Sequence, residues 1–168
     1  MTVKFKVNMT DKVMYDFLLY HNYTSMTGLV GGILGVLLLG VAIAKGTAGD
    51  IQTAILFFAI SVFVLMSTPM TLKATAKNQV KNTPMFQEPL EYEISEEGIK
   101  VSQHEESALN QWKDFSKVVS TSKSLILYIT RVRAIILPRE AMGDDYMAVV
   151  EMISKNVSAK KVKIRHTR

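Results

Sequence analysis

The stretch TGLVGGILGVLLLGVAIA (27–44), followed by KGTAGD (45–50) and IQTAILFFAISVFVLMSTPMTL (51–72), decides the fold of this chain. Its two apolar runs are 18 and 22 residues long and contain no charged residue. As helices they would measure roughly 27 and 33 Å, and a bilayer core needs about 20 apolar residues. A soluble core helix shows a polar stripe every three or four residues, which neither run has. The sequence therefore predicts two transmembrane helices that form a hairpin.

The charges of the chain separate this membrane part from the rest. The formal net charge is +5 over 168 residues, and there is no cysteine, which excludes disulfides and thiolate metal sites. Residues 1–81 carry seven Lys and three Asp, so the remaining residues carry thirteen Lys or Arg and twelve acids. The excess lies near the membrane, which argues against a nucleic-acid partner.

The lysines that flank the hairpin predict its orientation. Lys4, Lys6 and Lys12 precede it and Lys73, Lys77 and Lys81 follow it. Because Lys and Arg stay on the cytoplasmic side, both termini should be cytoplasmic and the connecting loop outside. The spacing of Lys73, Lys77 and Lys81 also suits contacts with anionic lipid headgroups, although the ordinary orientation signal accounts for them equally well. A cleaved signal peptide ending at the small residues 42–44 is disfavoured by the length of the apolar run.

The first 26 residues predict a strand and a helix. In TVKFKVN (2–8), apolar residues alternate with lysines, as in a half-buried strand. Thr10 and Asp11 suit the start of a helix that continues to Tyr23. This helix either lies at the membrane interface or runs straight into the first span, and the sequence leaves both open. We expect the strand 3–7 to pair with the sheet formed after residue 88.

Glycines in the first span occur at four-residue spacing, which lets two helix backbones approach closely. The pairs are Gly28 with Gly32 and Gly31 with Gly35. They predict either self-association into a homo-oligomer or packing against the second span of the same chain. The second interpretation is favoured because the small residues of the second span are available within the chain.

A second domain is predicted at 88–168, after a linker at 76–87 that includes the helix-breaking Asn82-Thr83-Pro84. Its apolar positions change to the alternation typical of strands. Six short strands are expected, at 90–94, 99–101, 108–112, 115–120, 125–130 and 134–137. An antiparallel meander followed by one amphipathic helix, with apolar residues at 146, 149, 150, 153 and 157, is the plan of a pleckstrin-homology-like (PH-like) half-barrel. The predicted fold class is thus a membrane helical hairpin plus an α+β domain, with a basic tail from Lys155 onward.

The chain resembles the YcxB-like family of bacterial membrane proteins. The resemblance is carried by Phe86 with Leu90-Glu91-Tyr92, Glu97-Gly98-Ile99, Trp112 with Phe115 and Val118, Leu125-Ile126-Leu127-Tyr128, and Ile135-Ile136-Leu137-Pro138-Arg139. It also includes the two spans and the strand and helix ahead of them. It implies a bacterial inner-membrane protein with a cytoplasmic PH-like domain, and it supplies no site residues.

Residues with catalytic or metal-binding chemistry are sparse. The three histidines, at 21, 104 and 166, are separated, and His104 with Glu105 and Glu106 is a poor metal site without further ligands. Neither span contains an ionisable residue for a proton relay. Trp112 is expected in the core, and Arg131, Arg133 and Arg139 on a solvated charged face. We therefore expect no catalytic, metal or cofactor site.

Two hypotheses for function remain. The leading one is a non-enzymatic binding or regulatory module whose domain receives a protein partner along a sheet edge by main-chain hydrogen bonds. The alternative is recognition of anionic membrane lipids through Lys73, Lys77, Lys81 and the basic tail. A membrane enzyme would need a polar cluster that the sequence does not contain.

Overall fold

The computed structural model describes residues 2–165, with Thr27 described through its backbone alone. The chain divides into two compact units. The helical unit is Leu18–Lys77, and the second unit combines Met1–Phe17 with Asn78–Arg168. The three long helices are α1 (Asp11–Tyr23), α2 (Met26–Thr47) and α3 (Ile51–Asn82).

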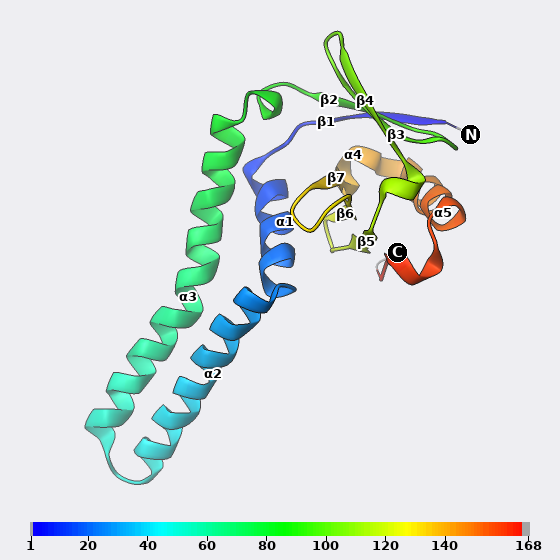
Figure 1. The fold of residues 1–168 in the computed structure, drawn as a ribbon. Coiled ribbons are helices and arrows are strands. Elements are labelled where there is room, and N and C mark those ends of the chain that lie inside the picture. Colours follow the sequence, from blue (N-terminus) through cyan, green and yellow to red (C-terminus); the bar gives the residue numbers. More distant parts are fainter. Residues whose placement is uncertain (1, 166–168) are drawn as a thin grey trace. The chain divides into compact units, whose positions relative to one another are not determined.

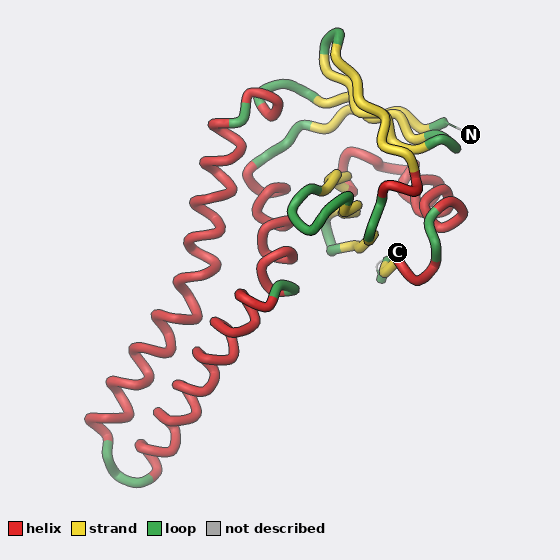
Figure 2. Tube along the Cα trace, in the orientation of Figure 1, coloured by secondary structure: helices red, strands yellow, loops and turns green. Residues whose placement is uncertain are grey.

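In the helical unit, α2 and α3 lie side by side as an antiparallel pair (Figures 1 and 2). The hydroxyl of Ser61 on α3 donates a hydrogen bond to the carbonyl oxygen of Gly35 on α2 (2.8 Å). Large apolar side chains point away from the pair, and Phe63, for example, is 74% exposed. Both helices are long and apolar enough to cross a membrane, and a soluble protein rarely exposes so much apolar surface. The two predicted membrane-length helices are therefore confirmed.

The helix ends differ from the predicted boundaries. α3 continues through Pro69 to Asn82, so the part of the predicted linker from 76 to 82 is helical. Nothing between Pro69 and Pro84 interrupts a helix, and Pro84 disfavours helical geometry only at the residue before it. α1 and α2 are separate helices, because the helical backbone is interrupted at Thr24 and Ser25. The Ser25 hydroxyl caps the start of α2 by accepting the amide hydrogen of Gly28 (3.2 Å). The first helix does not run straight into the first span.

The second unit contains a four-stranded antiparallel sheet in the order β1-β2-β3-β4. Its strands are β1 (Val3–Val7), β2 (Leu90–Ile94), β3 (Gly98–Gln103) and β4 (Glu106–Gln111). β1 lies beside β2 (Figure 1), with Val3 opposite Ile94 and Val7 opposite Leu90. The predicted pairing of the N-terminal strand with the sheet after residue 88 is confirmed.

A second four-stranded sheet has the order β7-β6-β5-β8. Its strands are β5 (Lys117–Ser120), β6 (Ser124–Tyr128), β7 (Ala134–Pro138) and β8 (Val162–Lys163). Strands β2–β4 and β5–β7 are each antiparallel, but they lie in two different sheets, so the predicted single antiparallel meander does not form. β8, which the sequence did not predict, runs parallel to β5. The chain leaves the first sheet at a 3₁₀ turn, Trp112–Asp114. The amide of Gln111 bonds to the Asp114 carboxylate (2.9 Å) there, which turns the backbone out of the strand.

Both sheets and helix α5 (Tyr146–Asn156) contribute to one core. The apolar face predicted for this helix, from Tyr146 to Val157, is buried. The short helix α4 (Arg139–Met142) precedes it. Burial raises the pKa of the Tyr92 hydroxyl to about 12.

Trp112 belongs to this core, as predicted. Its indole N–H donates a hydrogen bond to the carbonyl oxygen of Ser95 (3.0 Å), and its ring centroid lies 5.9 Å from that of Phe115. Because the ring is almost fully buried, Trp112 does not serve as an exposed binding anchor.

The first turns of α1 also belong to the second unit. The Thr121 hydroxyl donates a hydrogen bond to the Asp16 carboxylate (2.6 Å), and the rings of Phe17 and Tyr128 lie 6.2 Å apart. β1 and the start of α1 therefore contact residues between positions 90 and 128, which follow the two apolar helices in the sequence.

Candidate functional site

The lysines at the end of α3 are exposed. Lys73, Lys77 and Lys81 follow one another at four-residue intervals on a continuous helix, so they lie along one helix face. The part of the tail that the structure describes includes Lys160, Lys161, Lys163 and Arg165, whereas His166 and Arg168 lie outside the described residues.

The four glycines proposed for helix packing differ in their surroundings. A Cβ atom at Gly35 would lie 2.5 Å from the side chain of Leu65 on α3, and one at Gly28 would lie 2.1 Å from the carbonyl oxygen of Asn22. At Gly31 and Gly32 an added Cβ would meet no atom within 4 Å. Gly35 thus allows close packing within the chain, and Gly31 and Gly32 face open space.

The structure places the polar residues of the β3–β4 turn without forming a metal site. His104 Nε2 lies 2.8 Å from a carboxylate oxygen of Glu88, and no group of three metal-ligating side chains occurs within the described part of the chain. Arg139 stacks on the ring of Tyr146 at 4.2 Å. Arg131 and Arg133 lie exposed in the turn between β6 and β7.

β4 is an edge strand with unusual exposure. It pairs with β3 on one side, and five of its six residues are exposed while Asn110 is half-buried. Leu109 is 45% exposed. Soluble proteins protect such edges with lysines, prolines or covering segments, and β4 contains neither lysine nor proline. At the opposite edge, β1 carries Lys4 and Lys6.

The register shows which main-chain groups of β4 face outward. Gln103 pairs with Glu106 across a two-residue turn, and residues that flank such a turn exchange both main-chain hydrogen bonds. Bonded and non-bonded pairs then alternate, so Ala108 bonds to β3 while the N–H and C=O groups of Ser107 and Leu109 point away from it.

Two independent contacts agree with this alternation. The bond from the Ser95 amide to the Gly98 carbonyl oxygen (3.0 Å) directs even-numbered residues of β3 towards β2. The amide of Gln111, two residues after Leu109, turns away from β3 and bonds to Asp114 (2.9 Å). The edge of β4 therefore presents main-chain donors and acceptors at Ser107 and Leu109.

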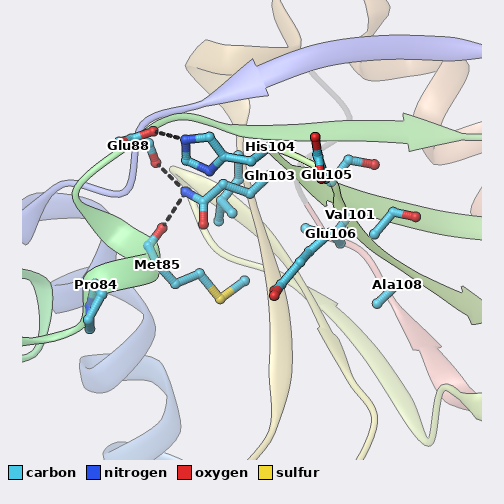
Figure 3. A pocket seen from close by; sticks show the side chains of 12 residues that line it. Pro84, Met85, Glu88, Val101, Gln103, His104, Glu105, Glu106 and Ala108 are labelled. Atoms are coloured by element: carbon cyan, nitrogen blue, oxygen red, sulfur yellow. Dashed lines mark hydrogen bonds and ion pairs between the residues drawn. The ribbon is translucent and has the colours of Figure 1, made fainter.

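A groove lies next to this edge, and we call it the hairpin groove (Figure 3). One wall is the β3–β4 hairpin, and the other is the segment from Pro84 to Leu90. The side-chain amide of Gln103 joins the walls, because its nitrogen donates to the carbonyl oxygens of Met85 (3.0 Å) and Glu88 (3.3 Å). The groove is lined by Pro84, Met85, Glu88, Leu90, Val101, Ser102, Gln103, His104, Glu105, Glu106, Ser107 and Ala108.

The lining combines acidic and apolar side chains. Glu88, Glu105 and Glu106 supply carboxylates, and among the residues that the structure describes no Lys or Arg lines the groove. Met85 is 46% exposed. In Figure 3 the side chain of Glu106 extends across the groove in the direction of Met85. The groove is therefore acidic with an apolar floor, although the chain as a whole is basic.

The sequence alone does not predict this groove. Residues 102–107 fall between the strands predicted at 99–101 and 108–112, and His104 with the adjacent glutamates is considered there only as a metal site. The segment 84–90 becomes the second wall through the bonds of Gln103, which spacing along the sequence does not reveal. The available signal was the polar, lysine-free stretch that follows the turn.

Comparison with known proteins gives one family and no individual relative. No curated protein and no solved structure matches the chain significantly. Residues 94–153 match the family described as YcxB-like protein. This segment runs from the end of β2 through β3 to β7 and α4 into most of α5, and it includes neither apolar helix. The resemblance of the chain to the YcxB-like family is therefore confirmed, and it covers residues 94–153.

Proposed function

We propose that this protein is a membrane-anchored docking module, in which the edge of β4 receives an extended segment of a partner protein. The observation that carries the proposal is the exposed edge strand, whose outward N–H and C=O groups at Ser107 and Leu109 face no other strand among the described residues. Addition of a strand to such an edge is a recurring mode of peptide recognition. The proposed role is binding or regulation without catalysis.

The remaining features of the proposal concern the location and the plan of the domain. We place the hairpin in a bacterial inner membrane with both termini in the cytoplasm, which the flanking lysines and the family resemblance support. The PH-like half-barrel plan is supported by two antiparallel-rich sheets that share a core with one C-terminal helix.

A pair of proline substitutions tests the docking edge. Leu109→Pro removes an outward N–H and leaves the bonds between β3 and β4 in place, because proline is tolerated where the amide faces solvent. Ala108→Pro removes an amide that bonds to β3 and should destabilise the sheet. A photo-crosslinking amino acid at Ser107, introduced into the full chain in its native membrane, reports contact at the edge.

The expected result is a defined adduct from position 107 that Leu109→Pro abolishes. The fold of the variant is checked by the fluorescence of Trp112, and a photo-crosslinker at Lys123, in the turn between β5 and β6, serves as the positional control. The same adduct in the Leu109→Pro chain, or equal adducts at positions 107 and 123, would show that the edge of β4 receives no strand.

A second candidate function is recognition of anionic lipid. It is favoured by the continuity of α3, which presents Lys73, Lys77 and Lys81 along one face. Each cationic side chain near an anionic surface contributes about 1 kcal/mol. Native mass spectrometry of the full chain released from mixed phosphatidylcholine and phosphatidylglycerol vesicles should show less retained phosphatidylglycerol after all three lysines are replaced by Gln. Replacement of Lys100, Lys113 and Lys123 is the control, and equal retention in both variants contradicts a specific role.

A further inference from the structure

The hairpin groove continues the docking edge, because Glu106, Ser107 and Ala108 belong to both. Side chains of successive residues in a strand point to opposite faces of a sheet. Glu106 and Ala108 share the face of Val101, since directly opposed residues of antiparallel strands lie on one face and Ala108 is opposite Val101. An added strand would therefore direct every second side chain into the groove.

The carboxylates of the groove determine which charge is favoured on the side chains of an added strand. Glu88 is engaged by His104, while Glu105 and Glu106 stand at the turn and first residue of the edge strand with exposed carboxylates. Opposite charges on directly opposed strand positions attract, and like charges repel. A segment with Lys or Arg opposite Glu106 is favoured over one with Asp or Glu there.

The groove also determines which size of partner side chain fits opposite Ala108. Ala108 is a small residue whose cross-strand neighbour Val101 is half-buried, and both line the groove with Met85. A large apolar side chain opposite Ala108 would therefore cover the exposed apolar floor of the groove, which removes that surface from water.

We infer that the segment received by β4 is basic, with a Lys or Arg that faces Glu106 and, two residues along, a large apolar residue that faces Ala108. This inference rests on the proposed docking function and specifies the chemistry of its partner. The charge complementarity between the acidic groove and a basic strand adds specificity and speeds association, and the main-chain bonds to Ser107 and Leu109 supply the common part of the affinity.

Three fluorescein-labelled peptides test the inference on the full chain in phosphatidylcholine nanodiscs, which carry no net charge. Their sequences are Thr-Arg-Thr-Leu-Thr-Arg-Thr, the same peptide with Gln in place of Arg, and the same peptide with Glu in place of Arg. The symmetric sequence presents a charged residue to Glu106 in either strand direction. Binding is measured by fluorescence anisotropy at low and high salt.

The expected result is the tightest binding for the arginine peptide, with an affinity that falls as salt rises. Glu106→Gln should weaken that binding by about 1.4- to 5-fold, the range for one opposite-charge cross-strand pair. Glu97→Gln changes the charge by the same amount at an exposed position in the β2–β3 turn outside the groove, and it should leave binding unchanged. Leu109→Pro should abolish binding of all three peptides.

The outcomes separate the inference from the function on which it rests. If the three peptides bind equally and Leu109→Pro abolishes their binding, the edge receives strands and the inferred preference for basic segments is overturned. The preference is also overturned if Glu97→Gln weakens binding as much as Glu106→Gln, because the effect is then one of net charge. Absence of binding, or binding that survives Leu109→Pro, overturns both proposals.

Discussion

Substitution of Val7 tests whether the first strand is a structural part of the C-terminal domain. Val7 is 0% exposed and lies opposite Leu90. Val7→Ala removes two methyl groups, which accounts for about 1.6 kcal/mol of lost burial. A residual cavity of about 40 Å³ adds about 1 kcal/mol. The expected loss is therefore about 2.5 kcal/mol, out of a total that is typically about 5–15 kcal/mol for a domain.

The assay is urea unfolding of the full chain in detergent micelles, followed by fluorescence. The chain contains one Trp, and Trp112 lies in the core that Val7 joins, so its emission reports this domain and not the helical hairpin. The urea midpoint should fall by roughly 1–2 M at constant slope. Lys4→Ala, on the exposed face of the same strand, should change stability by less than about 0.5 kcal/mol. Equal, small shifts for Val7→Ala and Lys4→Ala would refute the assignment of β1 to the domain core.

Three further predictions concern other contacts. Trp112→Phe removes the hydrogen bond to the carbonyl oxygen of Ser95, which is half-buried and directly follows β2. The substitution should cost about 1–3 kcal/mol, measured by thermal unfolding with circular dichroism, and an unchanged midpoint would contradict it. Lys6 lies 2.8 Å from Glu91, and its hydrogen bond and charge hold the pKa of Glu91 below the usual range. The pair therefore stabilises the fold above the unfolded carboxyl pKa and loses this effect as pH falls through the lowered pKa. Glu91→Gln should flatten the stability profile below about pH 5, and a profile parallel to wild type would argue against the pair. Gly35→Val overpacks against Leu65 and should weaken the α2–α3 pair by about 1–3 kcal/mol, measured in a dodecyl sulfate titration followed by circular dichroism. Gly31→Val meets open space and should leave the pair unchanged. Similar titration curves for the two variants would count against this packing.

The elements that the sequence predicted correctly have strong local patterns. The hairpin helices lack charge over 18 and 22 residues, and the alternation of Val3, Phe5 and Val7 with lysines allows only one strand face to be buried. The apolar face of α5, from Tyr146 to Val157, repeats at helical spacing and is buried as predicted. For β1 and α5, burial of one face is a direct consequence of periodicity.

The features that the sequence did not predict depend on contacts between distant residues. The chain leaves the first sheet at Trp112 because the Asp114 carboxylate bonds to the amide of Gln111 at the end of β4. The alternating sequence pattern alone predicts that the strand continues. β8 pairs in parallel with β5. It contains only two residues, which is too short for a recognisable period. The hairpin groove requires Gln103 to reach Met85, 18 residues earlier.

The place of β1 in the first sheet has a consequence for biosynthesis. Val7 and its partner Leu90 are separated by 83 positions, which include both apolar helices. At about 5–20 residues per second, a ribosome needs roughly 4–17 s to reach β2 after it has completed β1. During this interval the emerging strand has no neighbour in its sheet, and the two helices are synthesised first. Both apolar helices are therefore synthesised before the domain can close, and any delay in the synthesis of β2 prolongs the time in which an unpaired amphipathic strand is available to chaperones or to other nascent chains.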